Sequence, residues 1–322
     1  MPGIMRIECD GRRDLFADQW AAISVQRRRS GWTFMGATSA EAVLAQFTAA
    51  VDSEGLGVYG VHIRVGEETA SHRWRSDDRE NLYSVSKGVC VLATGMAIDE
   101  GLLDLDLRVI DVFGDLSLGE GVGDVTLRQL LTMTSGIDFL WFGHEPIPWP
   151  DLAAEMLRRP SAGRRFQYSD VSTYVAMRML AERVGDVRDW LMPRLFEPLE
   201  IDNPQWHRCP LGFIIGGTGL ELRTDELARI GDVLIDRGSW KGDVLVSPGW
   251  VDAMHTSWVE TGRPSPMDRY GLATWAGPDE AWRLEGRYGQ FVVVHGDAVV
   301  TITAHEESLE DRLSELAVQF TA

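Results

Sequence analysis

Cysteine is scarce in this 322-residue sequence, and its three cysteines, Cys9, Cys90 and Cys209, are odd in number and irregularly spaced. That pattern argues against a disulfide framework and a metal-binding knuckle, and it suits a reducing compartment. Long apolar runs are missing too: none would span a bilayer, and residues 1–30 lack the apolar centre of a signal peptide. We therefore expect a cytoplasmic protein.

Basic residues are fewer than acidic ones, which gives a formal net charge of −18 at pH 7. Such a chain repels nucleic acid and anionic membranes, so neither is an expected partner. Arg27, Arg28 and Arg29 form the one basic run, which we interpret as a solvated arm within an N-terminal extension over residues 1–37. With 44% hydrophobic and 25% charged residues, the composition is that of a soluble globular protein. The sequence leaves the oligomeric state open.

The signatures of several enzyme classes are also missing. The seven histidines are dispersed, and His305-Glu306-Glu307 lacks the second histidine of a zinc-peptidase helix. No Gly-x-Ser-x-Gly elbow is present, which disfavours an α/β-hydrolase. The glycine pattern over residues 55–60 runs into a strand, and no lysine follows the glycine-rich turn over 119–123, so neither predicts nucleotide binding. We expect no metal and no cofactor.

Lysine is nearly absent as well: of 31 basic residues only Lys87 and Lys241 are lysines, and the other 29 are arginines. Arginine keeps its proton in proteins, so it cannot act as a base. Lys87 stands three residues after Ser84, at the head of an apolar run over 85–98 that predicts a buried helix. At this spacing both side chains leave the same helix face, and a serine hydroxyl becomes a nucleophile when a neighbouring base takes its proton. Taken alone, this pattern is weak, and a helix start with Ser84 as its cap explains it better than catalysis does.

Strand patterns occur at both ends of the chain, and the middle is helical. Alternating β-rich segments predict a hairpin over residues 57–75 and strands over 270–275, 281–284, 288–294 and 298–304. Helices are predicted over 41–51, 85–98, 126–131, 151–158, 170–184, 186–195, 225–236, 248–254 and 308–320, with Ser39, Thr126 and Thr224 as caps. We predict an α+β fold, in which an antiparallel β-sheet flanked by helices is built from residues 38–104 and 216–322, with an inserted all-helical lobe at 105–215.

Five ordered segments carry a family resemblance: Ser84-Val85-Ser86-Lys87, residues 99–106, residues 127–136, Phe166-Gln167-Tyr168-Ser169-Asp170 and residues 217–220. Together they resemble the penicillin-binding-protein and class C β-lactamase superfamily, over about residues 40–322. The resemblance implies a serine acyl-enzyme mechanism in which Ser84 is the nucleophile, Lys87 its basic partner and Tyr168 the group that helps carry the proton. A phenol beside a lysine ammonium is pushed toward phenolate, which can deprotonate serine.

One departure from the superfamily lies in the second motif, where Asp170 replaces the usual asparagine. A carboxylate beside Lys87 favours the charged amine and leaves more of the basic role to Tyr168.

The other departure is the missing Lys-Thr-Gly motif. Its counterpart is Arg287-Tyr288-Gly289-Gln290, which resembles the Gly-x-x-Gly-Gln of relatives that hydrolyse esters or small amides, such as the aminohexanoate-oligomer hydrolases. That register implies an oxyanion hole formed by the backbone N–H groups of Ser84 and Gln290. Arg287 then supplies positive charge at the pocket wall, or is an exposed strand arginine.

The apolar segment Phe139-Leu140-Trp141-Phe142 follows the turn at Ser135-Gly136. In the superfamily this loop lies near the mouth of the site, so it either lines an acyl pocket or packs in the core. The predicted substrate-binding residues are Asp170, Arg287, Tyr288, Gly289, Trp141 and Phe142.

We predict a serine hydrolase that acts on a small-molecule ester or amide. A β-lactamase, a D-amino-acid peptidase and an acyltransferase are alternatives on the same fold. The missing Lys-Thr-Gly counts against the first, because that lysine helps to hold the carboxylate of penicillins. A cytoplasmic location removes cell-wall peptides as obvious substrates of a peptidase. An alternative of another class is a non-catalytic relative that binds a ligand in the pocket, although a pure binder has no need of Ser84, Lys87 and Tyr168 together.

Overall fold

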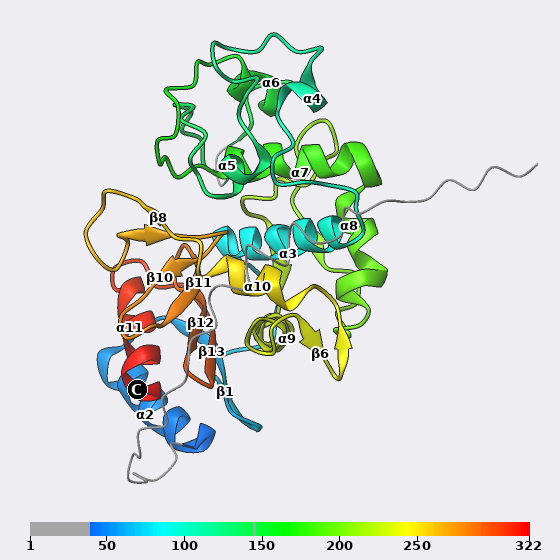
Figure 1. The fold of residues 1–322 in the computed structure, drawn as a ribbon. Coiled ribbons are helices and arrows are strands. Elements are labelled where there is room, and N and C mark those ends of the chain that lie inside the picture. The colour runs from blue at the N-terminus through cyan, green and yellow to red at the C-terminus, as the bar shows by residue number, and fades with distance from the viewer. Residues whose placement is uncertain (1–38, 144–145) are drawn as a thin grey trace, which may run out of the picture. The chain divides into compact units, whose positions relative to one another are not determined.

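The computed structural model describes residues 39–143 and 146–322, so the predicted N-terminal extension over 1–37, with Cys9 and the arginine run, lies outside the described residues. The centre of the described chain is an eight-stranded antiparallel sheet of order β2-β1-β13-β12-β11-β10-β9-β8 (Figure 1). Its strands are β1 (Val58–Val65), β2 (Glu68–Arg73), β8 (Val259–Glu260), β9 (Arg269–Tyr270), β10 (Trp275–Ala276), β11 (Trp282–Gly286), β12 (Gln290–His295) and β13 (Ala298–Ala304).

The first and last strands of this sheet in sequence are neighbours in space. β1 pairs with β13 from Val58 opposite Ala304 to Val65 opposite Ala298, so segments from the two ends of the described chain lie side by side. The predicted fold class, an antiparallel sheet flanked by helices, is confirmed. The limits of the helical lobe, residues 105–215, stay a prediction.

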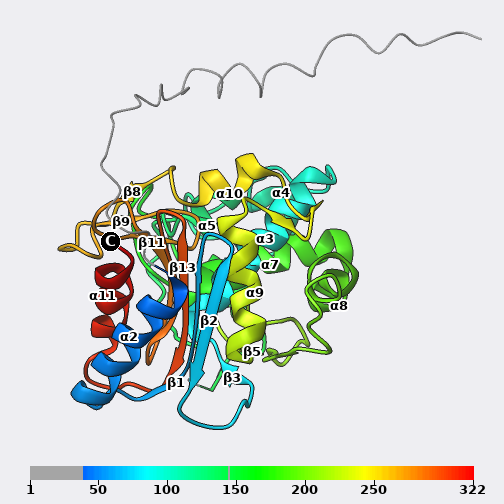
Figure 2. The same ribbon diagram turned by 90° about the horizontal axis from the view of Figure 1, so that it is seen from below.

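The helices divide between the two faces of the sheet and the region beyond it. Figure 2 shows α2 and α11 together on one side of the strands and α9 on the other. The helices are α2 (Ala40–Glu54), α3 (Ser86–Asp99), α4 (Ile110–Phe113), α5 (Leu127–Leu131), α6 (Leu152–Leu157), α7 (Asp170–Val184), α8 (Val187–Leu191), α9 (Thr224–Ile235), α10 (Pro248–Met254) and α11 (Glu310–Thr321). Short elements complete the fold: η1 (Tyr83–Val85), η2 (Met192–Phe196), β3 (Glu80–Asn81), β4 (Gln205–Trp206), β5 (Leu220–Leu222), β6 (Ser239–Trp240) and β7 (Asp243–Val244).

Strand β12 shows why this sheet needs helices on both faces. Successive side chains of a strand point to opposite sides. Phe291 and Val293 belong to the apolar cluster that includes α2 and α11 residues. Val292 and Val294 belong to the larger cluster that contains α3, α7 and α9. The strand is therefore apolar on both sides and reads as a continuous hydrophobic run.

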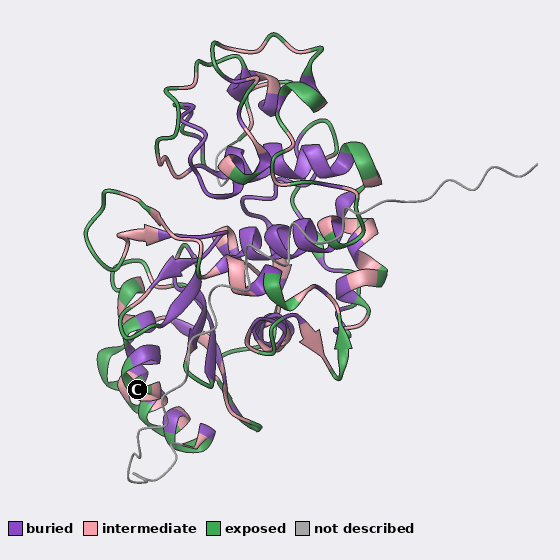
Figure 3. Ribbon diagram, viewed as in Figure 1, coloured by how far each residue is buried: buried purple, intermediate pink, exposed green. Residues whose placement is uncertain are grey.

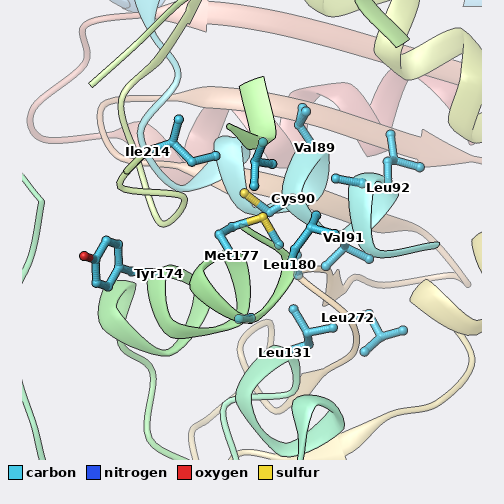
Figure 4. Packing of buried hydrophobic residues seen from close by; sticks show 14 of the residues in the cluster. Val89, Cys90, Val91, Leu92, Leu131, Tyr174, Met177, Leu180, Ile214 and Leu272 are labelled. Carbon is cyan, nitrogen blue, oxygen red and sulfur yellow. The ribbon is translucent and has the colours of Figure 1, made fainter. Parts of the chain in front are cut away.

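Helix α3, which carries Lys87, is buried all round. Every residue from Ser86 to Ala97 is buried (Figure 3). Figure 4 shows Val89 to Leu92 of this helix surrounded by apolar side chains that include Met177 and Leu180 of α7. A helix without a polar face belongs in the interior, and this packing holds the side chain of Lys87 in a fixed place.

Two sequence-based expectations for local structure are wrong. Thr224 is the first residue of α9 and not its cap, which is Arg223. The Thr224 hydroxyl instead contacts the hydroxyl of Thr303 on β13 at 2.7 Å and accepts a hydrogen bond from Arg73, so sheet packing takes the group that would have capped the helix. The segment 270–275 is not one strand: it turns tightly, and Tyr270 of β9 pairs with Trp275 of β10. No described helix combines the length and apolarity that crossing a membrane requires.

Candidate active site

Ser84 lies in a strained turn immediately before α3. Tyr83 has a φ of +46°, which is uncommon for a residue with a side chain. Asn81 holds this turn, because its Oδ1 accepts hydrogen bonds from the Tyr83 N–H at 2.9 Å and from the Gly219 N–H at 3.1 Å. Such strain persists where surrounding contacts enforce it, and it often marks functional sites. The turn places Ser84 in the wall of a pocket.

The ammonium group of Lys87 uses all three of its protons. Its Nζ donates to Ser84 Oγ at 2.7 Å, to Asp170 Oδ1 at 2.6 Å and to the Gly217 carbonyl at 2.8 Å. The side chain is 1% exposed, so these partners compensate the loss of water around the charge. The spacing of Ser84 and Lys87 therefore produces the expected contact.

Asp170, the first residue of α7, is buried with both carboxylate oxygens occupied. Oδ1 accepts from Lys87, and Oδ2 accepts from the Gly143 N–H at 2.8 Å. An asparagine here would offer an N–H to a substrate, whereas a carboxylate only accepts. The substitution thus removes one donor from the site and adds a negative charge that pairs with Lys87.

Gly217 makes the third contact of Lys87 possible, because its backbone passes very close to Asp170. A Cβ at position 217 would lie 2.6 Å from the backbone oxygen of Asp170 and 2.7 Å from its Cα. Real Cβ atoms do not approach backbone atoms so closely. A glycine is therefore required for the Gly217 carbonyl to reach Lys87.

We expect Gly217→Ala to lower the free energy of unfolding by about 1–3 kcal/mol, the usual cost of overpacking. Activity should fall as well, since Asp170 and Lys87 must shift. Gly249→Ala is the matched control: a Cβ there has no neighbour within 4 Å, and alanine in a helix is neutral or stabilising by up to about 1 kcal/mol. Urea unfolding of both variants measures the difference. Equal midpoints would show that the close approach is unimportant.

Tyr168 is a partly buried phenol beside the nucleophile. Its ring lies 4.7 Å from Lys87 Nζ, and its side chain interacts with that of Ser84. Burial raises the pKa of Tyr168 well above its ordinary value, the charge of Asp170 raises it further, and the interaction with Ser84 opposes both. The raised pKa keeps this phenol protonated at rest, which is opposite to the direction that the sequence-based argument expected from Lys87.

A pocket of about 280 Å³ opens beside Ser84, Tyr168 and Asp170. Strand β11 forms one wall through Glu285, Gly286 and, just past its end, Arg287. Gly286 approaches the nucleophile turn closely: a Cβ at 286 would lie 2.3 Å from the Leu82 carbonyl oxygen and 3.2 Å from Ser84 N. Glycine at this position thus brings the end of β11 against the Ser84 N–H.

Gln290, whose backbone N–H was predicted to form part of the oxyanion hole, is not among the residues that line the pocket. Gln290 lies on β12, one strand behind the pocket, opposite Gly286 in the pairing. Its side chain is 1% exposed and donates to the Ala304 carbonyl on β13. Arg287 to Gly289, between Gly286 and Gln290, form the hairpin turn, and of these three residues Arg287 lines the pocket.

The predicted substrate-binding residues separate into two groups. Asp170, Arg287 and Phe142 line the pocket. Trp141 does not: it is 2% exposed, packs in the main core and donates to the Pro146 carbonyl. Tyr288 and Gly289 form the hairpin turn at φ values of +65° and +87°, and the Tyr288 ring packs on Tyr83 and His305. Trp141 and Phe142 are adjacent but occupy different places: Phe142 lines the pocket as predicted, whereas Trp141 packs in the core.

Several pocket residues were missed by sequence reasoning. Glu285 lines the pocket beside Gly286 and pairs with Arg283 at 2.7 Å. Burial raises the pKa of Glu285 above its ordinary value, against the opposing charge of Arg283. Trp275 stacks on Tyr168 at 5.7 Å, and Arg263 lies 5.7 Å from the Trp275 ring. Among these residues, only Glu285 and Gly286 had a signal in the sequence that could have indicated a pocket wall, because they directly follow the strand predicted over residues 281–284.

Comparisons with known proteins place this geometry in a family. The family model described as Beta-lactamase matches residues 40–305. A 6-aminohexanoate-dimer hydrolase of Paenarthrobacter ureafaciens is 28% identical over 218 residues, which cover 59% of this chain and 55% of that relative. The match thus spans little more than half of the curated relative's length.

Solved structures agree at the level of fold. A family VIII carboxylesterase superimposes with a TM-score of 0.67 at 17% identity, covering 89% of this chain and 99% of that chain. A class C beta-lactamase superimposes with a TM-score of 0.69 at 14% identity, covering 86% and 94%. The family model spans most of the chain and includes the Ser84 turn, Lys87 and Tyr168; the chain belongs to the β-lactamase family.

Proposed function

We propose that this protein is a serine hydrolase that forms an acyl-enzyme on Ser84 and cleaves a small ester or amide. The observation that carries the proposal is the hydroxyl of Ser84, which lies 2.7 Å from Lys87 Nζ and borders the pocket that Tyr168 also lines. A nucleophile, a proton-accepting pair and a place for the substrate carbonyl are the requirements of acyl transfer.

Ser84 attacks the carbonyl carbon, and its proton passes to the coupled pair of Lys87 and Tyr168. The pair accepts this proton only after it has itself given one up, because the raised pKa of Tyr168 keeps the phenol protonated at rest. The leaving group takes the proton from the same pair as the tetrahedral intermediate collapses. Water, activated in the same way, then attacks the ester on Ser84 and releases the acid.

The oxyanion of the intermediate needs two donors. We assign them to the backbone N–H groups of Ser84 and Arg287, in place of Gln290. Arg287 follows Gly286, whose backbone lies against Ser84 N, and both residues line the pocket.

The pocket favours a small substrate over a penicillin. Its volume of about 280 Å³ is at the lower end of small-molecule sites. Glu285 stands on the strand that carries a lysine in the superfamily's third motif, so the β11 wall beside Ser84 presents a carboxyl group rather than an ammonium group. The lysine that helps to hold the carboxylate of penicillins therefore has no counterpart on β11, which counts against β-lactamase activity.

A panel of nitrophenyl esters of increasing acyl length, with nitrocefin and a nitroanilide alongside, tests the proposed reaction. Short acyl esters should be hydrolysed with the highest kcat/KM, and nitrocefin should be a poor substrate. Preferential turnover of nitrocefin would identify a β-lactamase instead. Absence of turnover on every compound would favour the non-catalytic relative, for which the closed Lys87–Asp170 pair is the supporting observation.

Replacing Asp170 with asparagine should move the activating limb of the pH profile to lower pH. The carboxylate lies 2.6 Å from Lys87, and its charge contributes to the raised pKa of Tyr168. Removing that charge lowers the pKa of Tyr168 and makes the basic form of the pair available at lower pH. The comparison is kcat/KM against pH for both proteins on one nitrophenyl ester. An unchanged or upward-shifted activating pKa would show that Asp170 does not control the pair.

A further inference from the structure

A second cavity lies on the α11 side of the sheet, separate from the pocket at Ser84. Its volume is about 350 Å³, larger than that of the catalytic pocket. The loop before β9, the turn between β10 and β11, strands β11 and β12, and the second half of α11 form its walls. None of its lining residues belongs to the Ser84 pocket.

The walls of this cavity are largely apolar, and they surround one buried cation. Pro266, Pro278, Val293 and Val318 contribute apolar surface. Arg283 also lines the cavity and is 3% exposed. The other charged lining residue that the structure describes, Glu315, is exposed at the rim, where it already pairs with Arg312.

Arg283 is incompletely satisfied. Its Nε donates to Glu285 at 2.7 Å and its Nη1 to the Ala276 carbonyl at 2.9 Å. Its Nη2 is buried and has no acceptor among the described residues. A buried guanidinium N–H without an acceptor is costly, and a carboxylate is the ligand that matches its geometry best. Nη2 is covered by protein atoms in this structure. A ligand can therefore pair with Nη2 only if the guanidinium group turns toward the cavity.

We propose that the second cavity binds a small amphipathic carboxylate. Its acid group pairs with Arg283, and its hydrocarbon chain lies against the walls formed by Pro266, Pro278, Val293 and Val318. One positive charge at the base of an apolar cavity selects this chemistry over a neutral hydrocarbon, which leaves Nη2 unpaired. It also selects against a polar anion such as phosphate, which leaves the apolar walls exposed to water.

The two cavities share structural elements. Arg263 and Met267 line the catalytic pocket, while Ser265 and Pro266, between them in sequence, line the second cavity. Arg283 contacts the second cavity, and its partner Glu285 contacts the catalytic pocket. A carboxylate bound at Arg283 therefore touches the loop and the strand that border the nucleophile.

Isothermal titration calorimetry of the full chain with butyrate, hexanoate and octanoate tests the site. Burial of hydrocarbon should strengthen binding about fourfold for each added methylene. Hexanamide, which is neutral and of matched shape, should bind at least about tenfold more weakly than hexanoate, because it lacks the charge that pairs with Arg283.

Two variants locate the binding. Val318→Phe fills the cavity without changing Arg283 or any residue of the Ser84 pocket, and Arg283→Met removes the cation. Each should weaken hexanoate binding by about tenfold or more. Val244→Phe and Arg237→Met are the matched surface controls, 63% exposed in the first case and in an exposed ion pair in the second, and should stay within about twofold.

Three results would overturn the proposal: no saturable binding up to octanoate, equal affinity for hexanamide and hexanoate, or undiminished binding by Val318→Phe. The last result would place the acid in the catalytic pocket. Calorimetry does not depend on turnover, so its outcome is independent of whether Ser84 forms an acyl-enzyme. If Arg283→Met fails to fold, Val318→Phe and the amide comparison still decide the question.

Discussion

Replacing Ser84 with alanine should lower kcat/KM on nitrophenyl esters by on the order of 10⁴-fold or more, because no other group can carry the acyl chain. The fold should survive. Lys87 loses one of three acceptors and keeps Asp170 and the Gly217 carbonyl. The loss of a single hydrogen bond should cost about 1 kcal/mol of unfolding free energy. Ester hydrolysis and urea unfolding of the same preparation measure both effects.

Ser86→Ala is the matched control for Ser84→Ala. It removes a hydroxyl two residues away that is fully buried and accepts a hydrogen bond from the Leu220 N–H at 3.2 Å. This variant should lose more stability than Ser84→Ala, about 1–3 kcal/mol, since a buried donor is left without an acceptor. When folded, it should retain most of the activity. Substantial activity in Ser84→Ala would remove the central claim.

Replacing Lys87 with arginine should lower activity by about 10²–10⁴-fold, the usual contribution of a positioned base. Arginine keeps the positive charge beside Asp170 but has no proton that it can release. The side chain is fully buried, so the larger guanidinium also adds an overpacking cost of about 1–3 kcal/mol. Circular dichroism must therefore show a folded variant before kcat is compared.

Lys241→Arg provides the matched control, because Lys241 is the other lysine of the chain. Its side chain is 60% exposed and pairs with Glu200. Activity should be unchanged within about twofold, as for other surface substitutions. If Lys87→Arg retained a similar share of activity, Lys87 would serve as a fixed charge and not as part of the basic pair.

Local sequence signals predicted those parts of the site that neighbouring residues determine. Ser84 and Lys87 share a turn of chain, so their spacing alone implied the contact that the structure contains. Asp170 begins a helix whose limits, residues 170 and 184, the apolar pattern predicted to the residue. Its approach to Lys87 followed from the family resemblance, not from the helix. The overall fold was predictable because strand patterns at both chain ends left few ways to bury two apolar faces.

The other predictions concern features that depend on tertiary structure, namely the path of loops, burial and contacts between distant segments. Gln290, the predicted oxyanion donor, lies away from the pocket because Arg287 to Gly289 form a hairpin turn that carries the chain from β11 to β12. Trp141 and Phe142 are both large aromatic residues, so the sequence does not distinguish them. The path of the loop places Trp141 in the core and Phe142 at the pocket. The pKa of Tyr168 depends on its burial, which no local pattern reports. Arg283 and Glu285 lie on the same face of β11, so their pairing follows from a local spacing. The second cavity, which Arg283 lines, also needs residues from three distant segments, and no local pattern predicts that arrangement.

The most direct test of the account is reaction with a serine-directed fluorophosphonate, read by intact-protein mass spectrometry. A nucleophilic serine displaces fluoride and retains the phosphonyl group, so the wild-type mass should increase by one such group. Ser84→Ala should show no increase under the same conditions, and Ser86→Ala should react like the wild type. An unlabelled wild-type protein, or equal labelling of wild type and Ser84→Ala, would contradict the claim that Ser84 is the nucleophile.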